Sequence, residues 1–82
     1  MITLEQAKGL RYGQTLHHVT LKNADGTPLR VRVTGSVKTW KRDKTRIRVP
    51  LKHGLYEYGY LVNGTFESEH GFDMDIKDVE LA

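Results

Sequence analysis

Residues 29–52 read LRVRVTGSVKTWKRDKTRIRVPLK, and this stretch, the central segment, decides the fold. Both of its ends alternate apolar with basic residues, and the apolar members are Leu29, Val31, Val33, Ile47, Val49 and Leu51. A period of two is the pattern of β-strands that bury one face. We therefore expect two strands that pair antiparallel around residues 42–45 and turn these valines and Ile47 into a core.

Charge is concentrated in the same segment. It holds nine of the chain's 13 basic residues against a single acid, Asp43, for a net charge of +8. The nine are Arg30, Arg32, Lys38, Lys41, Arg42, Lys44, Arg46, Arg48 and Lys52. From residue 57 to the end, seven acids face one lysine, for a net charge of −6, and the whole chain carries +3. A basic middle followed by an acidic end indicates a polyanionic partner, or an internal pairing of the two segments.

Composition limits the class of protein. The 82 residues predict one small domain, residues 1–82, with a modest core. The chain has no cysteine, which excludes disulfides and thiolate zinc sites. No apolar run approaches the roughly 20 residues that span a bilayer, and the polar N-terminus is unlike a signal peptide. We expect a cytoplasmic protein that contacts no membrane.

The N-terminal part of the chain predicts a helix and a first strand. Thr3 and Gln6 have the spacing of a capping box, so we expect a short helix over residues 3–11 that covers one end of the core. Residues 14–22 form the first strand. Its apolar phase changes by one residue, which predicts a bulge near His17 and His18.

Glycine and proline mark the boundaries in the rest of the chain. Gly35, within a run too long for one strand, predicts a sharp bend, and Pro50 predicts a strand end or a sheet edge. A fourth strand over residues 56–62 ends at the turn signal Asn63-Gly64, and a fifth starts at residues 65–68. The pattern predicts a mainly β fold: a small SH3-like or OB-like barrel of about five or six antiparallel strands with a short N-terminal helix.

The runs NADGTPLRVRV, KTWKRD and VPLKHGLYEYGYL resemble those of short uncharacterised proteins from phages and prophages. The resemblance covers about residues 14–62 and leaves the acidic end outside. These runs are not the signature of any chemistry, and the group brings no established activity or functional residues. What the resemblance implies is a phage or mobile-element context.

The basic hairpin is the candidate binding surface. Alternation places Arg30 and Arg32 on one face of their strand, and it does the same for the two arginines that flank Ile47. If the strands pair, the four guanidinium groups share one exposed surface: Arg30, Arg32, Arg46 and Arg48. Further cations extend it toward the tip: Lys38, Lys41, Arg42 and Lys44. Like charges opposite one another destabilise a sheet, so the surface favours an anionic ligand.

Three kinds of partner remain open for this surface. Sequence-tolerant binding of nucleic acid, either DNA or RNA, is the leading interpretation, because phosphate contacts carry no sequence information. The alternative is a phage adaptor or assembly module that binds an acidic protein surface. The protein's own acidic end is a third occupant, and a solvated face without a ligand is the fourth reading.

Aromatic residues accompany the cations. Trp40 shares the phase of Lys38, which favours exposure and a base-stacking role, whereas a tryptophan at a strand end is also an ordinary core anchor. The rings of Tyr56, Tyr58 and Tyr60 fall on one face of a strand, where they pack across strands or stack on unpaired bases. Both sets of rings therefore have a structural and a nucleic-acid interpretation.

The sequence offers no support for catalysis. It has no glycine-rich phosphate loop, no nucleophile elbow and no cysteine nucleophile. His17 and His18 point to opposite faces of a strand, and the acids after Gly71 lack the spacing of a calcium loop, so we expect no metal site and no cofactor. A barrel of this size also encloses little room for a small-molecule substrate. We expect a binding protein and not an enzyme.

Overall fold

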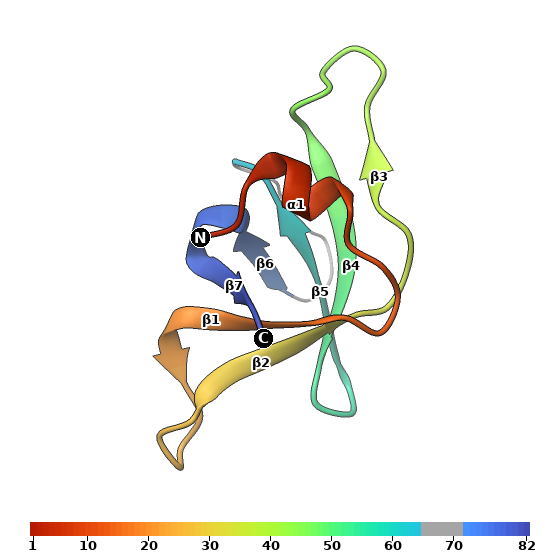
Figure 1. Ribbon diagram of the computed structural model, residues 1–82. Helices are drawn as coiled ribbons and strands as arrows, with labels where there is room; N and C mark the ends of the chain where they lie inside the picture. Colours follow the sequence, from red (N-terminus) through yellow and green to blue (C-terminus); the bar gives the residue numbers. More distant parts are fainter. Residues whose placement is uncertain (65–71) are drawn as a thin grey trace.

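The computed structural model describes residues 1–64 and 72–82. Their elements in chain order are α1 (Leu4–Lys8), β1 (Thr15–Lys22), β2 (Pro28–Val33), β3 (Lys38–Thr39), β4 (Ile47–His53), β5 (Glu57–Val62), β6 (Phe72–Asp75), the 3₁₀ turn η1 (Ile76–Asp78) and β7 (Val79–Leu81). The strands form one curled half-barrel sheet, and α1 lies across its concave side (Figure 1). The predicted mainly β barrel with an N-terminal helix is confirmed.

The sheet has the order β6-β5-β4-β2-β1-β7, and β3 adds a second, shorter partner to β4. The described residues thus hold seven strands, more than the five or six expected. All pairs are antiparallel except β5 and β6, which run parallel with Leu61 opposite Met74. The strand predicted at residues 65–68 lies outside the described residues.

The hairpin predicted for the central segment forms, but in two pieces. β2 pairs with the end of β4 through Val33 and Leu51, and β3 pairs with its start through Thr39 and Ile47. Between these pieces the chain bends at Gly35, as predicted. A Cβ at Gly35 would lie 3.1 Å from Pro50 Cγ, so the bend packs directly on the proline ring.

The expectation that Pro50 marks a strand end or a sheet edge is wrong. Pro50 lies inside β4, which has β5 on one side and both β2 and β3 on the other. The Pro50 carbonyl accepts a hydrogen bond from Thr34 N at 2.9 Å. Because the nitrogen and the carbonyl of one strand residue point to the same side, the ring nitrogen faces the bend. There β2 has ended and β3 has not begun, so no donor is needed.

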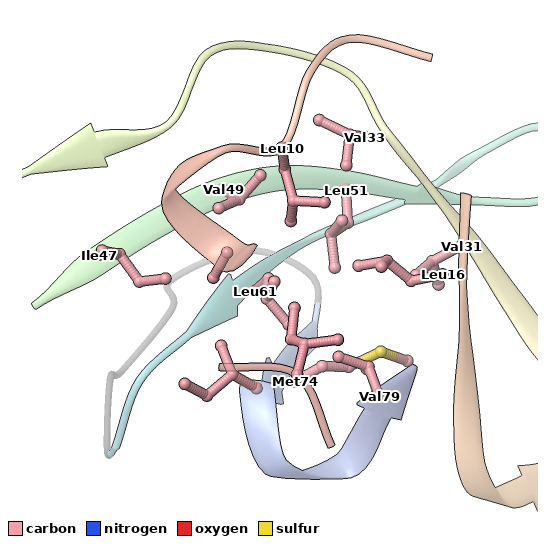
Figure 2. Packing of buried hydrophobic residues seen from close by; sticks show 13 residues of the cluster. Leu10, Leu16, Val31, Val33, Ile47, Val49, Leu51, Leu61, Met74 and Val79 are labelled. Carbon is pink, nitrogen blue, oxygen red and sulfur yellow. The ribbon is translucent and has the colours of Figure 1, made fainter. Parts of the chain in front are cut away.

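One face of the sheet is the core (Figure 2). Val31, Val33, Ile47 and Val49 are each at most 1% exposed, as the alternation predicts. The core is completed by Leu51 of β4 and by residues from the rest of the chain: Ile2, Ala7, Leu10, Leu16, Leu61, Met74, Ile76 and Val79. Thr3 and Gln6 form the predicted capping box, and Ala7 and Leu10 bury the helix against the sheet. The opposite face of the sheet is called the outer face below.

The predicted bulge in β1 is also present, and a histidine side chain closes it. The register of β1 against β2 shifts between His17 and Lys22. His18 Nδ1 accepts hydrogen bonds from the backbone N–H groups of Thr20, at 3.1 Å, and Leu21, at 2.9 Å. A ring nitrogen that accepts carries no proton, so the proton of the neutral imidazole lies on Nε2. The imidazole thus satisfies donors that the bulge removes from the strand ladder.

Replacing Ile47 with alanine tests the central core contact. Ile47 is 1% exposed, so we expect the Ile47→Ala variant to lose about 2–4 kcal/mol of unfolding free energy through lost burial and a residual cavity. Urea denaturation followed by circular dichroism measures the change. Val19→Ala, at a 41% exposed position of β1, is the control and should lose far less. Equal losses in the two variants would contradict the described core.

Replacing Gly59 with alanine tests the parallel pairing. A Cβ at this buried position would overlap the Phe72 carbonyl oxygen and lie 2.5 Å from the ring atom Cδ2. We expect Gly59→Ala to destabilise the fold by about 1–3 kcal/mol or more, because β6 must move away from β5. Gly9→Ala, where the nearest atom is 3.6 Å away, is the matched control. A Gly59→Ala variant as stable as this control would rule out the close β5–β6 approach.

Candidate nucleic-acid interface

The outer face brings basic side chains from three strands together. Burial of the odd-numbered residues on β2 and β4 turns their even-numbered neighbours outward. Arg30 and Arg32 on β2, Lys38 on β3, and Arg48 and Lys52 on β4 therefore share this face. The arginines of β2 and Lys38 are exposed, and Arg48 and Lys52 are half-buried.

Two cross-strand pairs on this face join like charges. Arg32 lies opposite Lys52, and Lys38 lies opposite Arg48. Directly opposed side chains in an antiparallel sheet have Cβ atoms only about 4.5–5.5 Å apart, and like charges at that separation destabilise the pair. The sheet therefore holds a repulsion that an anion placed over the face would relieve.

The sequence predicts that the four guanidinium groups share one exposed surface. In the structure they do not form a single cluster. The register places Arg32 at the Lys52 end of β4 and Arg46 and Arg48 at its other end. Lys52 lies four positions after Arg48 on β4, which corresponds to about 13 Å at roughly 3.3 Å per residue. The bend at Gly35 causes this separation, because it makes β2 and β3 pair with different stretches of β4. The face thus carries two basic groups, one with Arg32 and Lys52 and the other with Lys38, Arg46 and Arg48. Pro50 and Tyr60 lie between the two groups.

Aromatic rings lie beside the cations of both groups. The Arg46 guanidinium lies 4.5 Å from the centroid of the Trp40 ring, and Lys38 Nζ lies 5.3 Å from it. Arg48 lies 4.8 Å from the Tyr60 centroid. At the far end Lys52 Nζ lies 5.4 Å from Tyr58, which is 57% exposed. These cation–π contacts fix the orientation of charged groups that would otherwise move freely.

The loop between β3 and β4, residues 40–46, is the tip loop, and it projects beyond the sheet (Figure 1). Its cations are all exposed: Lys41, Arg42, Lys44 and Arg46. Asp43 is used inside the loop, since its Oδ1 accepts from Thr45 N at 3.0 Å and from Thr45 Oγ1 at 2.5 Å. These hydrogen bonds stabilise the carboxylate and lower the pKa of Asp43. The only acid of the central segment thus shapes the loop.

Trp40 is half-buried at the start of the tip loop. Its contacts with Lys38 and Arg46 agree with the phase that places it beside the outer-face cations. It also lines a hollow on the other side of the edge strand β3, with Val37, Thr39 and three lysines: Lys8, Lys41 and Lys44. Trp40 therefore lies between the outer face and a second basic surface.

That second surface, the α1–β3 groove, is a feature that the sequence did not reveal. Two hollows of about 430 and 450 Å³ share Lys8 and Val37. The second is lined by Lys8, Leu10, Arg11, Tyr12, Gly35, Ser36 and Val37. Lys8, Arg11 and Tyr12 lie in or just after the helix and 17 to 21 positions before the start of the central segment (29 − 12 and 29 − 8), so alternation along a strand could not connect them to it. A basic residue in the last helical turn was the only local signal.

Residues 72–82, at the acidic end of the chain, dock against the sheet and extend it. Met74, Ile76 and Val79 are buried, and Asp75 accepts from Lys77 N and Gly64 N at 3.0 Å. Asp73 and Asp75 lie on β6, and one strand, β5, separates them from β4, which corresponds to two inter-strand spacings of about 4.8 Å each. Among the described residues, no ion pair joins Asp73, Asp75 or Asp78 to a cation.

Several of these acids line a separate cleft of about 290 Å³ at the other end of β4 from the tip loop. Its polar residues are His18, His53, Glu57, Asp73, Asp75 and Asp78. Burial raises the pKa of Asp73, and His53 Nδ1 lies 3.3 Å from Glu57 Oε2. Within residues 1–64 and 72–82, no group of three or more such side chains is arranged to hold a metal ion. The cleft carries charge opposite to that of the outer face.

Comparison with protein-family models, with curated proteins and with solved structures finds no match for this chain. The resemblance to phage and prophage proteins therefore stays a prediction. In the part of the chain that the structure describes, no helix is long and apolar enough to cross a membrane.

The Asp43–Thr45 pair allows a direct test of the tip loop. We expect the pKa of Asp43 to lie below the ordinary value of about 3.9, and Thr45→Ala to raise it by removing the hydroxyl donor. Because folding lowers the pKa, the ionised carboxylate stabilises the folded protein at pH values above the ordinary pKa. That stabilisation is lost as the pH falls through the pKa of the folded protein. Carboxyl NMR titration measures the pKa of Asp43 in the wild-type protein and in the Thr45→Ala variant.

A second pair supplies the internal control for that titration. Asp25 and Thr27 make the same two contacts in the β1–β2 turn, at 3.0 and 2.6 Å, and the pKa of Asp25 is also lowered. Asp25 should keep its low value in the Thr45→Ala variant. An Asp43 that titrates unchanged in that variant would contradict the loop geometry.

Proposed function

We propose that the protein binds nucleic acid without base-sequence specificity, through the outer face and the tip loop. The proposed contact residues are Arg30, Arg32, Lys38, Trp40, Lys41, Arg42, Lys44, Arg46 and Arg48. The observation that carries the proposal is the pairing of like charges, Arg32 with Lys52 and Lys38 with Arg48. A ligand with closely spaced negative charges removes both repulsions at once.

The spacing of the two basic groups supports a long polyanion. They lie about 13 Å apart along β4, and a DNA duplex carries one charge per roughly 1.7 Å of its axis, so about eight phosphates span that distance. One strand of nucleic acid can therefore reach both groups. The aromatic partners of the cations support nucleic acid over an acidic protein surface, because rings beside phosphate-binding cations are typical of surfaces that bind both the backbone and the bases.

The salt dependence of binding tests the proposal. In Arg32→Gln/Lys38→Gln, one cation is removed from each like-charge pair. If both cations contact phosphate, the slope of log affinity against log salt on duplex DNA falls by about 1.8, at roughly 0.9 per contact. The two sites are exposed and each loses a repulsive neighbour, so the free energy of unfolding should stay within about 0.5 kcal/mol. Fluorescence anisotropy at several salt concentrations gives the slope.

The matched control is Lys22→Gln/Lys77→Gln, which removes the same charge from exposed lysines outside the proposed surface. Its slope should stay at the wild-type value. Equal slopes in the two double variants would mean that net charge, and not this face, attracts the ligand. If the wild-type protein binds neither duplex nor single strand at about 50 mM salt, the nucleic-acid proposal fails and an acidic protein surface becomes the partner to test.

A further inference from the structure

A basic groove lies beside the outer face, on the far side of β3. The helix α1 and the turn after it form one wall, and the bend through Gly35 into β3 forms the other. Its two hollows contribute cations from both walls: Lys8, Arg11, Lys41 and Lys44. Among residues 1–64 and 72–82, neither hollow has an acidic lining residue. The floor is apolar, with Leu10 and Val37, so the groove combines positive walls with a surface that suits a flat apolar group.

The groove has an aromatic residue at each end. Tyr12 is 74% exposed in the hollow of about 450 Å³, and Trp40 lines the hollow of about 430 Å³. The backbone around Tyr12 is held firmly. Gln14 Oε1 accepts from Arg11 N at 2.6 Å, and Gly13 N donates to the Val33 carbonyl at 2.9 Å. The Tyr12 ring is therefore presented from a turn that is tied to the end of β2.

We infer that the α1–β3 groove binds an unpaired segment of nucleic acid, with bases stacked on the exposed Tyr12 ring, phosphates on the cationic walls and Trp40 bordering the bound strand. This inference rests on the proposed function and adds a preference for single strands to it. Hollows of about 430 and 450 Å³ are in the size range of sites for small molecules, roughly 300–1,000 Å³. A strand on the outer face reaches the groove by passing over β3, at the edge where Trp40 lies.

The test uses the full chain and three probes of equal length: single-stranded dT10, an abasic ten-residue strand and a ten-base-pair duplex. Trp40 is the only tryptophan and lies between the groove and the outer face, so its fluorescence reports binding at either surface, and the groove variant described below separates the two. We expect dT10 to quench Trp40 and to bind more tightly than the abasic strand, by roughly 5- to 140-fold per stacked base. The abasic strand has the phosphates without the bases, so the difference isolates stacking.

The groove variant is Arg11→Gln/Tyr12→Ala. It should lose most of the preference for dT10 over the abasic strand and keep its duplex affinity within about twofold. The matched control is Lys22→Gln/Tyr56→Ala, which removes a cation and an 87% exposed tyrosine from other surfaces. The control should behave as the wild-type protein does with all three probes.

The outcomes separate this inference from the proposed function. Equal binding of dT10 and the abasic strand by the wild-type protein overturns the groove inference and leaves duplex binding by the outer face intact. The same loss of dT10 preference in the groove variant and the control also overturns it. If the groove variant loses dT10 binding while Arg32→Gln/Lys38→Gln binds all probes normally, the groove stands and the outer-face proposal falls. Failure of every probe to bind overturns both.

Discussion

Burial of one row of β4, Ile47, Val49 and Leu51, is the interaction on which the rest of the structure depends. Each of these side chains stabilises the fold by about 1.5–3 kcal/mol when it leaves water. Because strand residues alternate, burying the row forces Arg48 and Lys52 outward. An opposed pair of like charges costs roughly 0.2–1 kcal/mol, so burial outweighs the repulsion. The hydrophobic core thus positions the basic face and tolerates its charge.

The second constraint is that two strands share β4. The bend at Gly35 ends β2 and starts β3 further along the same partner, and Pro50 lies where neither strand needs a donor. This arrangement separates the basic residues into two groups. It also leaves β3 as a two-residue edge strand, so Trp40 can lie between the outer face and the α1–β3 groove. A straight hairpin would have produced one cluster of arginines and no groove.

Charge is segregated in space as it is along the chain. The C-terminal acids belong to β6, η1 and β7, where Met74, Ile76 and Val79 fix them to the sheet. Several line a cleft at the far end of β4 from the tip loop, and Asp75 caps η1. Docking therefore directs Asp73, Asp75 and Asp78 to structural positions, and among the described residues none of the three is paired with the cations of the central segment.

The sequence by itself determined the features that depend on neighbouring residues. The period-two alternation identified the buried face of β2 and β4, Thr3 and Gln6 gave the capping box, and the phase change in β1 gave the bulge that His18 closes. These are local because each follows from backbone geometry over a few residues. Tertiary structure alone decided the register along β4, the parallel β5–β6 pair that Gly59 permits, and the place of Pro50 inside a central strand. It also brought Arg11 and Tyr12 to the groove beside Trp40, since contacts between residues far apart in the chain depend on how the sheet curls and not on any local pattern.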